Sequence, residues 1–271
     1  SMSSVRFPRL VGVLHLPPLP GSPRHTQPMA ALEARVAEEA RLLVDAGFEG
    51  LVVENFGDAP FFAGAVPPVT VAALTALALA ARAVSPGVPL GVNVLRNDGA
   101  AALSVAAAVG ASFVRINVLT GARVTDQGVI QGDAAALLRL RRSLGLDGVA
   151  LFADVDVKHS APLAPRSLAA EVKDTVLRGL ADAVLVTGEG TGVAVDEARL
   201  TEVRQAAAGA PVYVASGATV DALPRLASRC DGVLVGSALR AGGRAGEPLD
   251  AAAVEAFAAA FRRAFGPRPG T

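Results

Sequence analysis

Cysteine is almost absent from this sequence of 271 residues, which contains Cys230 and no other. A single cysteine excludes an internal disulfide framework and suits a reducing compartment. Cys230 is expected to be a small residue of the hydrophobic core. An excess of charge is absent as well, because 25 basic residues balance 25 acidic ones. That balance argues against nucleic acid or an anionic membrane surface as a partner. Lysine is also scarce, since Lys158 and Lys173 are the only two in the chain.

The sequence also lacks a long hydrophobic run of the kind that crosses a bilayer. Its longest alanine-rich stretch, residues 70–84, is interrupted by Arg82 and is expected to form a buried helix instead. The first ten residues have neither the basic start nor the apolar stretch of a secretory signal. Ser1 before Met2 is expected to be a cloning remnant, and residues 1–4 a disordered start. A cytoplasmic protein without integral membrane association is therefore predicted.

What the sequence does contain is an alternation of short apolar, β-branched runs with alanine-rich helical stretches. This alternation is typical of βα units built on a parallel sheet. Several segments also repeat one pattern, in which a helix end is followed by a short turn and a strand. Eight strands are predicted, at residues 10–15, 50–55, 90–95, 112–118, 149–157, 183–188, 211–217 and 232–237.

Eight βα units in a chain of this length predict a (β/α)8 TIM barrel that spans residues 1–271 as one domain. An open, doubly wound sheet is the main alternative. Such sheets usually carry a glycine fingerprint after their first strand, and the segment "HLPPLPGSP" at that place is not one. The barrel is preferred, and its active site is expected at the carboxyl ends of the strands.

The fifth predicted strand leads into the most unusual polar cluster, "DVDVKHSAPL" at 154–163. The odd-numbered residues from 149 to 157 are all apolar, so they are expected to face the helices. Because side chains alternate along a strand, Asp154, Asp156 and Lys158 are then directed towards the lumen and the mouth of the barrel.

The same alternation adds polar side chains from other strands to the predicted mouth. Charged groups gathered there must pair with one another if they are buried. A structural ion pair of Arg115 with Asp154 or Asp156 is therefore the alternative to a catalytic role. The further candidates are His15, Glu54, Asn93, Arg115, Asn117 and Thr187.

The last two predicted strands end in small residues, "ASGAT" at 215–219 and "VGSAL" at 235–239. TIM barrels commonly hold a phosphate in the loops after strands seven and eight, where glycine lets the backbone approach the anion. Any tight turn between a strand and a helix also needs small residues, which is the alternative explanation. The loop "TGEGTG" at 187–192 can also contact an anion, although it lacks the ending of a P-loop. The predicted phosphate-binding residues are Ser216, Gly217, Gly236 and Ser237, with Thr187 and Gly188 as further contacts.

Three kinds of chemistry are open for the polar cluster. Lys158 is expected to act as an electrophile or a charge partner, because flanking carboxylates would raise its pKa and disfavour the neutral amine. His15 and His159 are candidates for general acid–base catalysis, since imidazole titrates near neutral pH. A bound divalent cation such as Mg²⁺ is the third alternative, because hard cations prefer carboxylate oxygens. Its candidate ligands are Glu54, Asp154 and Asp156.

Seven segments match the motifs of a known family in order and spacing. They are "GVLHLPPLPGSP", "VVENFGDAPF", "GVNVLRND", "DQGVIQGDA", "FADVDVKHSAPL", "VTGEGTG" and "DGVLVGSALRAGG". Through these motifs the sequence resembles the BtpA/SgcQ family over nearly its whole length, which implies a fold similar to the ribulose-phosphate-binding barrels. One departure is Arg240, where the family is expected to have lysine more often. Arginine keeps the charge and can grip an oxyanion, but it cannot form a Schiff base.

The resemblance implies two different functions. Some family members are associated with accumulation of photosystem I as peripheral thylakoid factors, while others occur in sugar metabolism or carry a nucleoside triphosphatase label. The first hypothesis is an enzyme for a phosphorylated sugar or nucleotide-like small molecule, a lyase, isomerase, transferase or phosphohydrolase. The alternative is a non-enzymatic factor for photosystem I biogenesis or stability. Association into homo-oligomers is open under both hypotheses, because barrels often pack through their helices.

Overall fold

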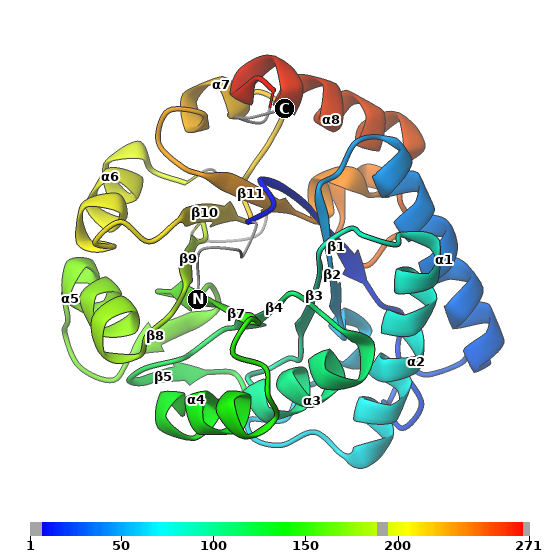
Figure 1. Cartoon of the computed structure of the whole chain (residues 1–271), viewed down its shortest axis with the longest axis horizontal. Coiled ribbons are helices and arrows are strands. Elements are labelled where there is room, and N and C mark those ends of the chain that lie inside the picture. The colour runs from blue at the N-terminus through cyan, green and yellow to red at the C-terminus, as the bar shows by residue number, and fades with distance from the viewer. Residues whose placement is uncertain (1–6, 189–194, 268–271) are drawn as a thin grey trace.

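Eight parallel strands close into a barrel in the computed structural model, which describes residues 7–188 and 195–267 (Figure 1). The first strand pairs with both the second strand and the last, which closes the ring and confirms the predicted (β/α)8 barrel. The expected disordered start, residues 1–4, and most of the 187–192 loop lie outside the described residues. Around the ring the order is β1 (Leu10–His15), β11 (Gly232–Val235), β10 (Val212–Ala215), β9 (Ala183–Val186), β7 (Ala150–Val155), β4 (Phe113–Ile116), β3 (Leu90–Asn93) and β2 (Gly50–Glu54).

Helices surround the barrel on its outside (Figure 1). One of them, α5, continues directly as a π-helical segment over Asp174–Arg178. One 3-10 turn follows β2, and two follow β11. The helices are α1 (Met29–Asp45), α2 (Pro68–Val84), α3 (Gly99–Val109), α4 (Ala134–Ser143), α5 (Leu168–Lys173), α6 (Glu197–Ala206), α7 (Leu223–Leu226) and α8 (Ala251–Phe265).

Helix boundaries follow local side-chain chemistry. The Asp98 carboxylate accepts a hydrogen bond from the Ala101 amide at 2.9 Å and so caps α3, which ends at Gly110 in the left-handed conformation. Asp196 and Asp250 cap α6 and α8 in the same way. These caps satisfy amides that would otherwise lack partners and fix where each loop of the barrel mouth joins its helix.

Two hydrophobic layers hold the fold together. The larger lies between strands and helices and includes Cys230, in which burial raises the pKa of the thiol to about 12, as expected of a core residue. The smaller fills the lumen with aromatic rings. The ring centroids of Phe113 and Phe152 lie 4.5 Å apart, and those of Phe152 and Tyr213 lie 5.1 Å apart. Gly91 makes room for this plug, because a Cβ there would lie 2.1 Å from the Phe113 ring. The apolar plug fills the lower lumen and leaves the upper lumen to polar groups.

A three-stranded sheet, in the order β6-β5-β8, is an addition that the sequence pattern did not predict. It consists of β5 (Ala122–Thr125), β6 (Gly128–Gln131) and β8 (Ser160–Pro162), which come from the loops after β4 and β7. Beneath it, Ile130 packs with Val118 and Val157 in a small apolar cluster of its own. The sheet therefore joins two neighbouring loops into one wall at the barrel mouth.

The end of β7 differs from the prediction of a strand over 149–157. The strand ends at Val155, and Asp156 takes a positive φ of 44°, which breaks the alternation of side chains. Asp156 consequently turns away from the lumen and forms ion pairs with Arg123 and Arg199. Val157 packs in the small cluster under the added sheet, and not against the helices as predicted.

The alanine-rich stretch 70–84 lies within α2, and one face of that helix is buried as expected. Its length and polarity fit a helix of the outer ring. In the part of the chain that the structure describes, no helix is at once long and apolar enough to cross a membrane.

Candidate functional site

A cavity of about 880 Å³ opens at the carboxyl ends of the barrel strands, the end at which the site was predicted. This volume is within the range of small-molecule sites. Asp154, Asp156, Thr187, Gly188 and Gly217 do not line it. The predicted residues that do line it are His15, Glu54, Asn93, Arg115, Asn117, Lys158, His159, Ser216, Gly236 and Ser237.

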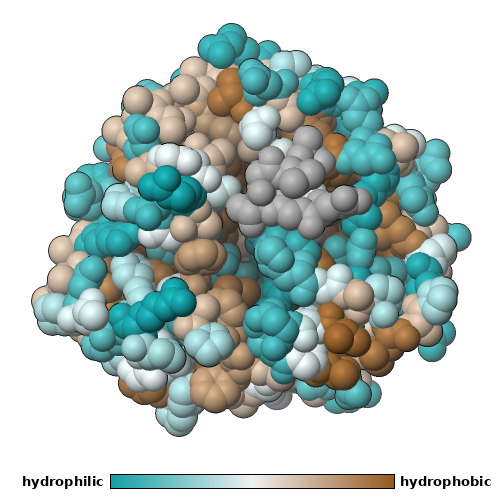
Figure 2. Space-filling model, turned by 180° about the vertical axis from the view of Figure 1, so that it is seen from behind, coloured by the Kyte–Doolittle hydropathy of each residue, from teal (hydrophilic) through white to brown (hydrophobic). Residues whose placement is uncertain are grey.

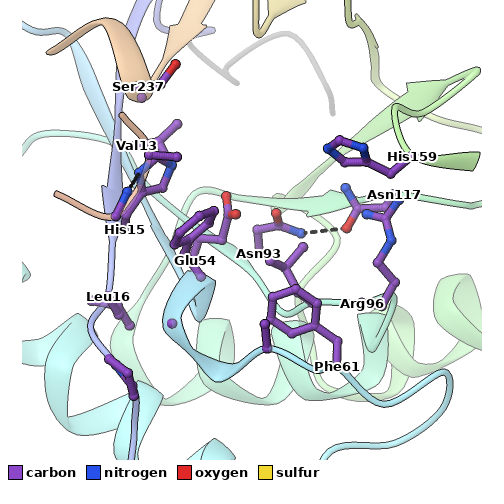
Figure 3. Close-up of a pocket in the computed structure, with 18 of the residues that line it drawn as sticks. Val13, His15, Leu16, Glu54, Phe61, Asn93, Arg96, Asn117, His159 and Ser237 are labelled. Carbon is purple, nitrogen blue, oxygen red and sulfur yellow. Dashed lines mark hydrogen bonds between the residues drawn. The ribbon is translucent and has the colours of Figure 1, made fainter. Parts of the chain in front are cut away.

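The order of the strands divides the cavity into two opposite walls. In a ring of eight, strands four places apart face each other, so β1 is opposite β7, β11 opposite β4, and β10 opposite β3. Figure 3 shows His15 and Ser237 on one side and Arg96, Asn117 and His159 on the other, with Glu54 and Asn93 between them. Below, the two sides are called the β1/β10/β11 wall and the β3/β4/β7 wall.

Asp154 anchors a buried hydrogen-bond network at the base of the cavity. Both of its carboxylate oxygens accept hydrogen bonds from Arg115, at 2.9 and 3.0 Å, and one also accepts from the Asn117 amide at 2.7 Å. The Asn93 amide in turn donates to Asn117 at 3.2 Å. With its oxygens engaged in this way, Asp154 is the structural partner of Arg115 that the alternative hypothesis described, and its catalytic assignment is not supported by its surroundings.

Several polar atoms of the cavity lining have no hydrogen-bond partner among the described residues. They include the side-chain oxygen of Asn93, a residue that is only 1% exposed, and the hydroxyl oxygen of Ser216. The others are the side-chain oxygen of Gln127 and the Nε atom of Arg35, which lies 3.5 Å from the Glu39 carboxylate. The hydroxyl of Thr187 is similarly unpartnered, although that residue does not line the cavity. Buried polar groups are hydrogen-bonded in the great majority of proteins, so these atoms are available to a ligand.

Glu54 ends β2 and brings a buried carboxyl group to the cavity. Burial raises the pKa of Glu54, and the positive charges of Arg115 and Lys158 offset only part of that rise. None of the described residues forms an ion pair with it within 4 Å. A carboxylate with a raised pKa is a stronger base than an ordinary glutamate, which suits proton abstraction.

Lys158 has the opposite shift to the one predicted. Burial and the nearby Arg115 lower the pKa of Lys158, and the carboxylates of Glu54 and Asp154 offset this only in part. The expectation of a raised pKa was therefore wrong, because burial and the charge of Arg115 outweigh the effect of the carboxylates. An ammonium group with a lowered pKa gives up its proton more readily than an ordinary lysine.

His15 lies at the end of β1 with its Nδ1 atom accepting a hydrogen bond from the Gly246 amide at 3.1 Å. Burial, Arg240 and Lys158 lower the pKa of His15 well below its ordinary value. The near-neutral titration assumed for this histidine is thus wrong, and the ring is neutral with its proton on Nε2. His159 lies after the end of β7 with a φ of 62° and is exposed at the cavity rim. Partial desolvation of its ring and the charge of Lys158 lower the pKa of His159 as well.

The three carboxylates proposed as metal ligands do not form a metal site. Asp154 is held by Arg115, and Asp156 by Arg123 and Arg199, which leaves Glu54 alone at the cavity. Within the described ranges 7–188 and 195–267, no group of three or more acidic, histidine or cysteine side chains can hold a metal ion. The side chains present therefore do not fit the predicted Mg²⁺ site.

The predicted phosphate loops lie side by side, because β10 and β11 are neighbouring strands. Ser216, Gly236 and Ser237 line the cavity, whereas Gly217 does not. Ser216 has a φ of 87°, a conformation that is strained for any residue except glycine. A Cβ on Gly236 would lie 2.8 Å from the His15 ring, so glycine allows the imidazole to sit against this loop.

Several lining residues were missed by the sequence analysis. Arg96 follows β3 in a loop, and Asp126 and Gln127 form the tip of the β5–β6 hairpin, where no periodic pattern marked them. Arg24 and Arg35 reach the cavity from the β1–α1 loop and from α1. The motifs "GVNVLRND" and "DQGVIQGDA" contain the first three, so the family resemblance was the signal that could have found them.

Arg240, by contrast, does not line the cavity. Its side chain is completely buried, donates to the Val13 carbonyl at 3.0 Å and to the Glu247 carbonyl at 2.7 Å, and pairs with Glu39. Arg240 therefore does not bind an oxyanion as considered above. Its side chain connects the loop after β11 to β1 and α1.

On the face shown in Figure 2, hydrophobic groups are scattered between hydrophilic ones around the hollow of the molecule. Two exposed apolar residues on the added sheet, Val124 and Val129, face each other across the β5–β6 pair. The surroundings of the cavity are therefore mixed in polarity, in keeping with the balanced charge of the sequence.

Comparison with known proteins places the chain among relatives of similar length. It is 42% identical over 260 residues to the photosystem I biogenesis protein BtpA of Synechocystis, covering 96% of this chain and 90% of that relative. An uncharacterised protein of Thermococcus kodakarensis is 45% identical over 235 residues (87% and 88% of the two chains). A protein of Caenorhabditis elegans, named as mitochondrial, is 32% identical over 258 residues (92% and 91%).

Solved structures with similar folds are TIM-barrel enzymes of low sequence identity. Phosphoribosyl anthranilate isomerase from Thermus thermophilus matches with a TM-score of 0.55 at 15% identity, covering 94% of this chain and 98% of that one. KGPDC from Streptococcus mutans matches with a TM-score of 0.57, also at 15% identity, covering 96% and 100%. These likenesses confirm the fold. A profile of the BtpA family matches residues 7–263, and with relatives of this identity and coverage the chain belongs to the BtpA family.

Proposed function

We propose that this protein is an enzyme that transfers protons within a phosphorylated small molecule bound at the carboxyl end of the barrel. The observation that carries the proposal is that Glu54 and Lys158, a carboxyl and an amino group without ion-pair partners among the described residues, line the same cavity. Leaving two such groups unpaired in a protein interior costs stability, and active sites are where this cost is accepted.

The two pKa shifts favour complementary roles. Glu54, whose pKa is raised by burial, is the base that takes a proton from the substrate. Lys158, whose pKa is lowered by burial, donates a proton to the oxygen on which negative charge develops, or stabilises that charge. Neutral His15 adds a fixed hydrogen-bond donor through Nε2. This division of roles favours an isomerase or lyase over the transferase and phosphohydrolase alternatives.

The β1/β10/β11 wall supplies the anchor for the phosphate. Ser216 and Ser237 offer hydroxyl groups, and Gly236 lets the ligand approach the backbone. The name of phosphoribosyl anthranilate isomerase, a structural neighbour, also describes a phosphorylated molecule, which supports the same class of ligand by analogy of fold.

The alternative function, a non-enzymatic factor in photosystem I biogenesis, is supported by the name of the Synechocystis relative alone. Relatives of comparable coverage occur in an archaeon and in a nematode, neither of which is photosynthetic. A small-molecule reaction accounts for this distribution better than a role in one photosynthetic complex. We therefore place the enzyme first and propose that it works in the cytoplasm or an equivalent reducing compartment.

The test is a thermal-shift panel of phosphosugars and nucleotides, measured with and without magnesium. We expect at least one phosphosugar to raise the melting temperature, and Lys158→Met to abolish turnover of that compound. Lys173→Met is the matched control, because Lys173 is the other lysine and is exposed at the end of α5. Unchanged melting with every phosphorylated compound would refute the proposal.

A further inference from the structure

Arg96 differs from the other buried arginines of the described residues. Arg115 pairs with Asp154, Arg123 with Asp156 and Glu171, and Arg240 with Glu39. Arg96 is 8% exposed and has no carboxylate within 4 Å in residues 7–188 and 195–267. Its Nη2 atom donates a hydrogen bond to the Lys158 carbonyl at 2.9 Å.

A second unpaired cation lies beside it. Lys158 forms no ion pair with the described residues, and its backbone carbonyl holds the Arg96 guanidinium next to it. Arg96 and Lys158 both line the cavity. Arg96 is buried and Lys158 is half-buried, so these two positive charges on one wall repel each other and are incompletely solvated, and an anion that contacts both is favoured.

This cation pair lies away from the phosphate anchor. Arg96 follows β3 and Lys158 follows β7, whereas Ser216 and Ser237 follow β10 and β11 on the opposite side of the ring. Figure 3 shows Arg96 and Ser237 on opposite sides of the cavity, with Glu54 and Asn93 between them. The cavity of about 880 Å³ has room for a whole small molecule, so a single ligand can contact both walls with different groups.

We propose that Arg96 and Lys158 form a second anion-binding site, so that the ligand carries two anionic groups, a phosphate at one end and a carboxylate or second phosphate at the other. The inference rests on the proposed function for its first anion and extends it to the substrate class. Arg96 binds the second group through its planar guanidinium, which matches a carboxylate or phosphate in two parallel hydrogen bonds. The ammonium of Lys158 adds a second positive charge to this site.

The unpartnered oxygen of Asn93 defines the middle of the ligand. It lies between the two walls and can only accept a hydrogen bond, so the bridging part of the ligand carries a donor such as a hydroxyl group. A polyhydroxy chain with an anionic group at each end, such as a sugar bisphosphate or a phosphorylated sugar acid, satisfies both walls and the centre.

The first experiment uses inorganic phosphate, which makes no demand on ligand shape. Isothermal titration calorimetry is expected to give two bound ions for each wild-type chain and one for Arg96→Gln. Arg142→Gln is the matched control, since Arg142 is an exposed arginine on α4, and it is expected to retain two. One ion in the wild-type protein, or two in Arg96→Gln, would overturn the second site.

The second experiment compares fructose 6-phosphate with fructose 1,6-bisphosphate, and glucose 6-phosphate with 6-phosphogluconate. The doubly anionic member of at least one pair is expected to bind about 10- to 100-fold more tightly than its partner, and Arg96→Gln to remove that difference. Arg96→Lys keeps the positive charge but lacks the planar guanidinium, so it should retain part of the difference in affinity. Equal binding within both pairs overturns the second site alone, whereas no binding of any probe overturns the proposed function as well.

Discussion

The amide of Gly246 donates a hydrogen bond to Nδ1 of His15 across 231 positions of the sequence. This bond fixes which ring nitrogen carries the proton, because an atom that accepts a hydrogen bond cannot hold one itself. His15 consequently presents Nε2–H as a donor while it is neutral, a state that the surrounding cations also favour. A backbone loop after the last strand thereby sets the chemistry of a side chain on the first.

We expect His15 to stay neutral at pH values where free imidazole is half protonated. Because burial lowers the pKa of His15, the folded state binds fewer protons than the unfolded state below about pH 6.5, and stability falls as the pH drops through this range. His15→Asn keeps an acceptor for Gly246 and removes the titration. Melting curves between pH 5 and 7.5 should show a smaller loss for His15→Asn than for the wild type, and an equal loss would contradict the assignment.

The wild-type protein without ligand should be less stable at neutral pH than the variant Glu54→Gln, in which the carboxyl group is replaced by an uncharged amide. Since burial raises the pKa of Glu54, the folded state holds the proton more strongly, and the cost of ionisation is present at pH values above the folded pKa and vanishes below the unfolded one. Glu54→Gln is expected to melt higher at pH 7.5, by on the order of 2–4 °C for each kcal/mol relieved. The gain should shrink as the pH falls towards 4. The exposed Glu33→Gln serves as the control and should show neither effect.

Ser216 is expected to trade stability for ligand binding. Its φ of 87° is strained for serine and relaxed for glycine, so Ser216→Gly should raise the free energy of unfolding by about 1 kcal/mol while it weakens phosphate binding. Ala208 has a φ of 54° on the exposed surface after α6, and Ala208→Gly should stabilise the fold without changing binding. Denaturant unfolding and phosphate titration of both variants test this, and unaltered phosphate affinity in Ser216→Gly would remove that residue from the anchor.

Arg115 and Asp154 should behave as a structural pair. Removing either partner leaves the other charge buried alone, and the expected loss is about 3–5 kcal/mol in the free energy of unfolding for Arg115→Met or Asp154→Leu. The double variant should lose less than either single variant, because it leaves neither charge behind. Urea unfolding of the three proteins checks this expectation, and additive losses would contradict it.

The fold and the place of the cavity could be predicted from sequence because they follow from short-range periodicity. Apolar runs separated by helical stretches specify a ring of strands, and alternation along β2, β3 and β4 directed Glu54, Asn93 and Arg115 correctly into the mouth. The prediction failed where a single backbone torsion intervened. Asp156 has a positive φ, and no pattern of residue types in "DVDVKH" announces it.

The electrostatics of the site could not be predicted in the same way. Whether Lys158 gains or loses basicity depends on its burial and on the charges around it, and here burial and the charge of Arg115 outweigh the effect of the carboxylates. Arg96 was missed because it lies in a loop, where residues reach a site through tertiary folding and not through periodicity. Among the described residues, the absence of a carboxylate partner for Arg96 also depends on the tertiary structure, in which the other buried arginines each pair with a carboxylate.

The junction of β1 with β11 also bears on how the protein is made. As the chain leaves the ribosome, β1 emerges first, but Arg240, which donates to the Val13 carbonyl, and Gly246, which orients His15, are synthesised close to the end of translation. An incomplete nascent chain therefore has an open ring and a histidine with no fixed tautomer. The ring closes, and the tautomer of His15 is fixed, only after the segment that carries Arg240 and Gly246 has been made.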